Sequence, residues 1–194
     1  QKLSISFIQH ISASPCVGVL VSARNSPRLS TILDSVMATL TGVGGGTAVA
    51  SAPLRRCALG TLTNLVKAWG SGSGSGGSDA LAVDPALKAR LVTVIREQAL
   101  PAILVYCQSE SNARDALTLS LYADVGSLFY AVGQDQNNDE FCNFLAMQLL
   151  PSLSWPPEPI AQLCALQSKA KVGAGTNLAD FREKFKAMLK SFRQ

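Results

Sequence analysis

The sequence predicts an all-α protein built from antiparallel helix pairs that stack as an α-solenoid, and three observations support this prediction. Apolar residues recur at spacings of three and four through most of the 194 residues, as on one face of a helix. No stretch of strict apolar–polar alternation is flanked by a hairpin turn such as Asn-Gly or Asp-Gly. Short connections make neighbouring helices antiparallel, and a row of such pairs has no closed core of its own.

The expected helices follow the apolar period, and several of their ends carry capping residues. The helices are expected at about residues 3–21, 28–42, 51–69, 84–108, 112–133, 137–150, 156–168 and 177–193, with an interruption near Pro101 left open. Asn25-Ser26-Pro27 ends one helix and starts the next, because proline suits a first helical turn. Further caps are expected at Asp84 before Pro85, at Ser111 or Asn112, and at Thr176 or Asn177.

The composition is that of a folded chain, with 47% hydrophobic residues, 15% charged residues and a formal net charge of +4. These values exclude a disordered, fibrous or collagen-like chain. No apolar run reaches the ~20 uncharged residues that a membrane span needs, so we expect a soluble chain without membrane insertion. The first residue is Gln1, and neither a basic n-region nor a cleavage site follows it. We therefore expect a piece of a longer polypeptide.

Two glycine-rich segments interrupt the helical pattern. Residues 42–47 are expected to form a loop, and the Gly/Ser tract at 70–78 a flexible connector. The tract contains a formal match to the dinucleotide fingerprint, but it follows a helix and not a strand, so cofactor binding is rejected. The first segment lacks the Lys-Ser/Thr of a phosphate-binding loop, and no cofactor is expected.

Few residues could carry catalysis or bind a metal. The cysteines lie far apart without a C-x-x-C motif, which favours reduced packing residues over metal ligands: Cys16, Cys57, Cys107, Cys142 and Cys164. The single histidine, His10, is expected at a partly exposed helix position. Asp139 and Glu140 are adjacent and would point about 100° apart on a helix, so they cannot flank one bond. We expect no catalytic residue, no metal site and no enzyme activity.

Charge is distributed unevenly along the chain. Between Asp115 and Glu158 there are six acids and no Lys or Arg, whereas residues 169–194 hold seven basic residues and two acids. The last helix carries an apolar stripe beside a basic stripe, Arg182, Lys186, Lys190 and Arg193, whose spacing suits a phosphate backbone. The alternative is a solvated outer face that closes a helical array and complements the helix dipole.

Arg55 and Arg56 open a helix, where the dipole disfavours cations. This pair either serves an outside partner or is merely exposed.

Segments along nearly the whole chain, in the correct order, resemble the C-terminal region of the exportin-T family, the tRNA exportins of the importin-β superfamily. The N-terminal segments are Phe7–Ile11, Gly18–Ser22, Asn25, Leu29–Val36 and Leu62–Gly70. The C-terminal segments are Phe144–Ala146, Leu149–Leu153 with Pro156-Pro157, Ala165–Gln167 and the basic run Phe181–Lys190. Two departures, the tract at 70–78 and an insertion at 169–176, are interpreted as loop expansions, whose closure cost grows slowly with length.

The resemblance implies that residues 1–194 are the C-terminal part of a HEAT-repeat solenoid. The full-length protein would bind mature tRNA with GTP-bound Ran in the nucleus, pass nuclear pore proteins and release its cargo in the cytoplasm after GTP hydrolysis. It would shuttle between nucleus and cytoplasm without catalysing a reaction. Ran would be held mainly by repeats absent from this chain. The candidate RNA contacts are Arg182, Lys186, Lys190 and Arg193, followed by Arg55 and Arg56.

The same solenoid could instead be a protein-binding scaffold or an import-type karyopherin that grips an acidic protein cargo. Salt dependence distinguishes the two hypotheses, because several phosphate contacts give a steep log–log slope and an apolar protein groove does not. An enzyme would require a pocket of perturbed residues that the sequence does not display.

Overall fold

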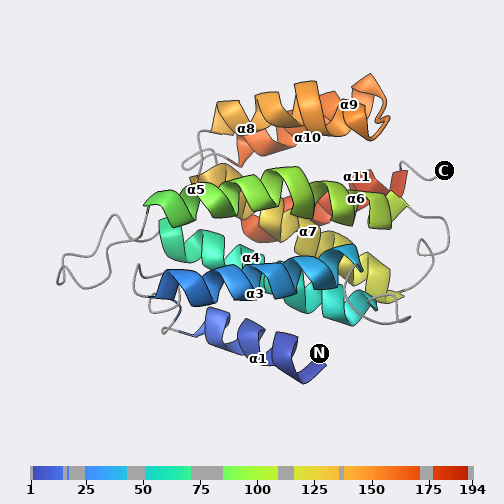
Figure 1. Cartoon of the computed structure of the whole chain (residues 1–194). Helices are drawn as coiled ribbons and strands as arrows, with labels where there is room; N and C mark the ends of the chain where they lie inside the picture. Colours follow the sequence, from blue (N-terminus) through green and yellow to red (C-terminus); the bar gives the residue numbers. More distant parts are fainter. Residues whose placement is uncertain are drawn as a thin grey trace. The chain divides into compact units, whose positions relative to one another are not determined.

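The computed structural model describes residues 2–14, 17, 25–42, 51–70, 85–108, 116–135, 138–170 and 177–191. Within these residues all regular secondary structure is helical, which confirms the all-α prediction (Figure 1). The chain divides into two compact units, residues 1–103 and 104–194. In each unit neighbouring helices pack side by side around buried apolar side chains, as in a stretch of HEAT-repeat-like solenoid.

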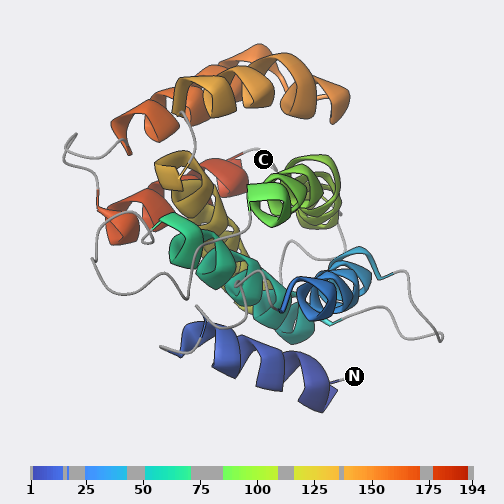
Figure 2. The same cartoon turned by 60° about the vertical axis from the view of Figure 1, so that its left-hand side comes forward.

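The N-terminal unit is organised around α4. Its helices are α1 (Lys2–Ala13), α3 (Ser26–Thr41), α4 (Ala52–Gly70) and α5 (Pro85–Val94), the last continued by the π-helical turn η4 (Ile95–Ala99). Helix α4 packs against both α1 and α3, and α3 also contacts η4 (Figure 2). The helices of this unit carry a set of leucines that are completely or almost completely buried: Leu29, Leu33, Leu40, Leu59, Leu62, Leu65 and Leu91.

The C-terminal unit consists of two packed layers of helices. Its elements are α7 (Ala116–Asp135), α8 (Asn138–Phe144), the π-helical turn η6 (Leu145–Leu149), α9 (Leu150–Ser152), α10 (Pro157–Lys169) and α11 (Leu178–Ser191). Helix α7 packs along α11, while α8 and η6 pack against α10 (Figure 2). The boundary between the units falls inside α6 (Leu100–Gln108).

Helix α7 is the core helix of its unit. By length and composition its stretch Ala116–Gln134 could cross a membrane, and it is the one described helix that meets this criterion. However, 61% of the stretch is buried inside the protein, and its side chains Leu121, Val125, Phe129 and Val132 are fully buried there. The apolar character of α7 is therefore explained by its central position.

Two prolines shape the long helices in the same way. Residues 85–108 stay helical through Pro101, but the turn before it widens, so that the Leu100 N–H donates to the Ile95 carbonyl five residues earlier. Pro151 is preceded by an equivalent turn, in which the Leu150 N–H donates to the Leu145 carbonyl. A proline provides no N–H and clashes with the carbonyl four residues back, and a π-turn accommodates both effects. The interruption anticipated near Pro101 is thus a local widening.

Most helix boundaries agree with the expected ones, and α1 is the clearest difference. It ends at Ala13, so the helix expected over residues 3–21 is not continuous; Val17 is again helical, and residues 15–16 and 18–21 lie outside the described residues. Pro15 follows Ser14 in the sequence, and a residue before proline is biased away from helical backbone. Ser14 instead turns back, with its Oγ donating to the Ile11 carbonyl at 2.7 Å.

The structure bears out two of the expected helix starts. Pro27 lies in the first turn of α3. Asn177 caps α11, because its Oδ1 accepts a hydrogen bond from the Asp180 N–H at 2.9 Å. The expected caps at Asp84, Ser111, Asn112 and Thr176 lie outside the described residues, as does most of the Gly/Ser tract at 70–78.

Candidate nucleic-acid interface

The position of the basic side chains on α11 is fixed by the apolar face of the same helix. The apolar stripe expected on this helix comprises Leu178, Phe181, Phe185, Met188, Leu189 and Phe192. Phe181 and Phe185 are fully buried, and Met188 and Leu189 nearly so, which confirms four of its members. The ring of Phe185 lies 5.0 Å from that of Phe129 on α7, measured between centroids. Gly126 permits this approach, since a Cβ there would lie 3.3 Å from the Phe185 side chain. The buried face thus orients the basic stripe.

Arg182 is the most constrained of the predicted contacts. Its Nη2 forms an ion pair with Asp124 Oδ1 on α7 at 3.5 Å, and the two side chains are 38% and 21% exposed. Arg182 Nε is buried without a hydrogen-bond partner. Arg182 therefore combines a partly shielded ion pair with a guanidinium whose donors are not all satisfied.

Lys186 is less exposed than Arg182, and Lys190 is more exposed than either. The Lys186 Nζ lies 3.4 Å from Glu183 Oε2, and its side chain is 27% exposed. Lys190, one turn further, is exposed and forms no ion pair with any described residue. Arg193 lies outside the described residues. Among Arg182, Lys186 and Lys190, the described members of the stripe, Lys190 is thus the cation most open to an external anion.

Lys184 adds a basic residue that the predicted stripe does not include. It forms an i,i+4 ion pair with Asp180 at 2.8 Å, and both side chains are about half exposed. Such surface pairs contribute little to stability and yield readily to a competing anion. Arg182, Lys184 and Lys186 on α11 therefore form ion pairs with acids that differ in exposure.

Arg55 is not exposed, contrary to one of the two hypotheses for the Arg55-Arg56 pair. The residue is 4% exposed, and its Nη2 would lie 3.4 Å from a Cβ placed on Gly42. Gly42 has φ 72° and ends α3, where the helix dipole is negative and a cation is favoured. The sequence alone places Arg55 at the unfavourable start of its own helix, but in the structure it lies beside the favourable end of another.

Arg56 is half-buried on α4 of the N-terminal unit. Arg182, Lys186 and Lys190 share α11 of the C-terminal unit. Arg182, Lys186 and Lys190 are therefore the candidate RNA contacts that lie on a single helix.

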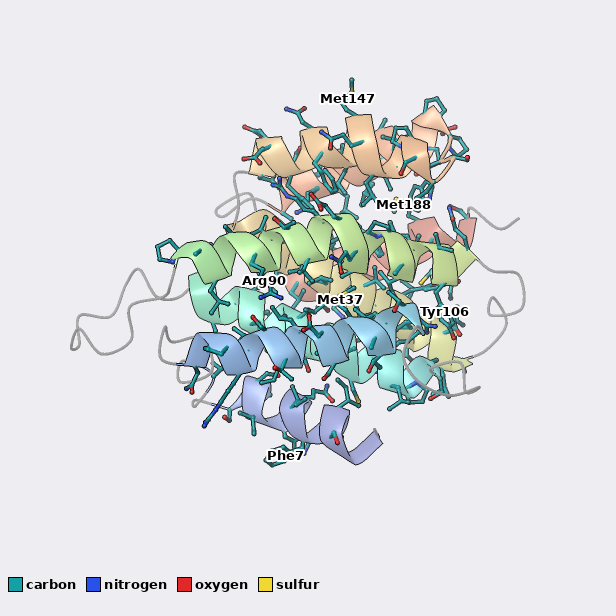
Figure 3. The ribbon with its side chains drawn as sticks, in the orientation of Figure 1. Phe7, Met37, Arg90, Tyr106, Met147 and Met188 are labelled. Atoms are coloured by element: carbon teal, nitrogen blue, oxygen red, sulfur yellow. The ribbon has the colours of Figure 1, made fainter. Side chains whose placement is uncertain are left out.

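Exposed apolar side chains would be the natural contacts of a protein-binding scaffold. Within the described part of the chain, the large exposed ones are Phe7, Val105, Leu117 and Met147. Phe7 and Met147 point away from their helices in Figure 3. These side chains belong to the separate elements α1, α6, α7 and η6, whereas the basic groups share one helix.

The described cysteines have the environment of packing residues, with Cys107 buried and Cys57, Cys142 and Cys164 partly buried, whereas Cys16 lies outside the described residues. Cys142 and Cys164 face each other between α8 and α10, and each thiol donates to the other residue's carbonyl, at 3.8 and 3.7 Å. Burial, followed by the neighbouring Cys142, raises the pKa of Cys164 to about 11, and burial also raises the pKa of Cys142. Both are thiols at neutral pH and poor nucleophiles. The described residues contain no group of three His, Cys, Asp or Glu side chains that could hold a metal ion.

Sequence reasoning missed the Asp124–Arg182 contact. The two residues are far apart in the chain and meet only because α7 packs along α11. One signal was available: Asp124 is the single charged residue within the apolar stretch 116–134. A carboxylate in such a helix requires a cationic partner when the helix packs.

The family comparison agrees with the resemblance described above. The family model of Exportin-T matches residues 1–192. Neither the curated proteins nor the solved structures give a match to this chain. The matched residues cover nearly the whole sequence and include every described helix. The chain therefore belongs to the Exportin-T family.

Proposed function

We propose that this chain is part of a nuclear export receptor that binds mature tRNA together with GTP-bound Ran and carries it from the nucleus to the cytoplasm. The observation that carries the proposal is the Exportin-T family match over residues 1–192. The proposal assigns GTP hydrolysis to Ran and no catalytic step to the exportin. The receptor shuttles between the two compartments and contacts nuclear pore proteins on the way.

The surface that we assign to RNA is the basic stripe of α11, defined as Arg182, Lys186, Lys190 and Arg193. Three of these cations recur four residues apart, a rise of about 6 Å along the helix, and so follow one line. Folded RNA is read largely through its shape, its phosphates and its 2′-hydroxyl groups, for which a fixed line of cations is suited. Arg55 does not belong to this surface because it is buried, and Arg56 is left out with it.

The first test replaces all four residues of the basic stripe by Gln, which keeps helical propensity and removes the charge. Binding of tRNA by the full-length protein with GTP-bound Ran should weaken for all tRNA species, and the log–log salt slope should become shallower by about three units. A matched control removes the same charge from Arg28, Lys67, Lys88 and Lys169, and should retain most of the affinity. If both variants bind tRNA like the parent protein, the basic stripe is not an RNA surface.

A further inference from the structure

Two cysteines of the C-terminal unit face each other across the contact between α8 and α10. The Cys142 Sγ lies 3.8 Å from the Cys164 carbonyl oxygen, and the Cys164 Sγ lies 3.7 Å from the Cys142 carbonyl oxygen. A side-chain hydrogen bond also links the two thiols. A disulfide requires two backbones that approach closely, and this reciprocal contact brings the backbones of α8 and α10 together at the two cysteines.

The cysteine pair lies at the edge of the helix contact, on the side that faces solvent. Cys142 and Cys164 are both partly exposed, whereas Phe141 and Leu163, the residues before them, are fully buried. The Ser168 Oγ lies 4.0 Å from the Cys142 Sγ, and Ser168 is exposed. A small oxidant therefore has access to the pair without separation of the two helices.

The surroundings of the pair do not stabilise a thiolate. Burial raises the pKa of both thiols, that of Cys164 to about 11, and outweighs the hydrogen bond with Ser168 that lowers the pKa of Cys142. A disulfide is strongly oxidising where the protein stabilises the thiolate that its reduction releases. Because neither thiolate is stabilised here, a disulfide between these residues forms slowly but is a weak oxidant and persists once formed.

We propose that Cys142 and Cys164 are an oxidation site, which forms a reversible internal disulfide and cross-links α8 to α10. The inference does not depend on RNA binding by this chain. In a reducing compartment the pair stays reduced, and oxidising conditions close it. The two cysteines are 22 residues apart, and the loop that they close contains η6 and α9. The disulfide therefore restricts local opening of this layer of helices.

The reaction is a thiol–disulfide exchange with a low-molecular-weight disulfide such as glutathione disulfide. One cysteine attacks the oxidant as its thiolate, so that a mixed disulfide forms, the S–S bond of the oxidant breaks and one small thiol leaves. The second cysteine then attacks the protein sulfur of the mixed disulfide, the internal S–S bond forms and a second small thiol leaves. In total the two cysteines lose two electrons and two protons, and the oxidant takes up both.

The test treats the purified full-length protein with glutathione disulfide and maps the products by mass spectrometry. Chymotrypsin, which cleaves after residues such as Phe144, is used because no Lys or Arg lies between the two cysteines for trypsin. The peptides that carry Cys142 and Cys164 should be recovered linked, with the loss of two hydrogen atoms, and a reductant should release them. Cys57→Ser, which removes a partly buried cysteine of the other unit, is the matched control and should form the same link.

Two single variants and a local measurement complete the test. Cys142→Ser and Cys164→Ser should each abolish the link, and circular dichroism checks that each variant is folded. In the oxidised parent protein, amide hydrogen exchange in α8 and α10 should slow by about threefold or more, while exchange in α1 stays unchanged. Recovery of both cysteines from the parent protein as free thiols, or as separate glutathione adducts, would overturn the inference. A linked protein in which exchange in α8 and α10 is not slowed would overturn it as well.

Discussion

At the scale of single residues, buried side chains with hydrogen bonds determine which neighbouring positions tolerate substitution. Gln167 is fully buried and donates from Nε2 to the Phe129 carbonyl at 3.2 Å, while Asn138 donates from Nδ2 to the Gln167 carbonyl at 3.1 Å. Both side chains lie against Gly133, which provides the space they occupy. These residues join the end of α7, the start of α8 and the end of α10. No sequence pattern announces this cluster, because its members are far apart in the chain.

Gly133→Ala should destabilise the protein by about 1–3 kcal/mol, although Ala usually favours a helix over Gly. An added Cβ would meet Gln167 Cδ at 2.9 Å and Asn138 Oδ1 at 3.0 Å, and both side chains are held by hydrogen bonds. Gly60→Ala is the matched control, because its Cβ meets the end of the half-exposed Gln9, which can move. Urea unfolding measures the free energy of unfolding of both variants. Equal stabilities for the two variants would show that the cluster adapts.

Arg55 illustrates what the sequence hides at this scale. The sequence shows a cation at the start of its own helix, where the dipole is unfavourable. It does not show that the end of α3 lies beside the same side chain. The burial of Arg55 follows from tertiary packing, and a local pattern could not predict it.

At the scale of elements, the periodic apolar pattern predicts most helices because their cores are formed by that same period. The two widened turns were not foreseen, although the sequence repeats their motif. Residues 91–101 read LVTVIREQALP and residues 141–151 read FCNFLAMQLLP, with Gln-x-Leu-Pro at the same place in both. Each segment contains a π-turn two residues before its proline. The repeat becomes clear once the common geometry is known.

Phe185→Ala should destabilise the protein by about 3–5 kcal/mol, because it removes a fully buried ring from the packing interface between α11 and α7. The same change should weaken RNA binding, since α11 then no longer holds the basic stripe in one orientation. Chemical unfolding measures the first effect and RNA titration the second. Lys184→Ala on the exposed side of α11 is the control and should change stability by less than about 1 kcal/mol. A stable Phe185→Ala protein would show that α11 does not depend on this contact.

At the scale of the whole molecule, composition did not reveal how the chain divides. The Gly/Ser tract has the composition of a linker, yet it joins α4 to α5 within the N-terminal unit. The division into units falls instead inside the continuous helix α6, whose apolar residues resemble those of any other helix. A boundary within a helix is determined by which neighbours each turn contacts, and a local sequence window does not contain that information.

The basic stripe could be predicted only in part, because the sequence shows helical spacing but not tertiary contacts. Its spacing and its placement beside an apolar stripe follow from helical geometry, and the structure has Arg182, Lys186 and Lys190 on α11 as expected. The ion pair between Arg182 and Asp124 depends instead on the packing of α11 along α7. Helical geometry therefore predicts which residues form the candidate surface, and tertiary contacts determine how exposed and how strongly paired each of them is.

The measurement that tests the central claim most directly is tRNA binding by the full-length protein with GTP-bound Ran, with GDP-bound Ran and without Ran, each at two salt concentrations. An exportin of the Exportin-T family should bind tRNA strongly only with GTP-bound Ran, and the affinity should fall steeply with salt. Binding of tRNA that ignores the nucleotide on Ran, or no binding with GTP-bound Ran, would contradict the account and favour a protein-binding scaffold.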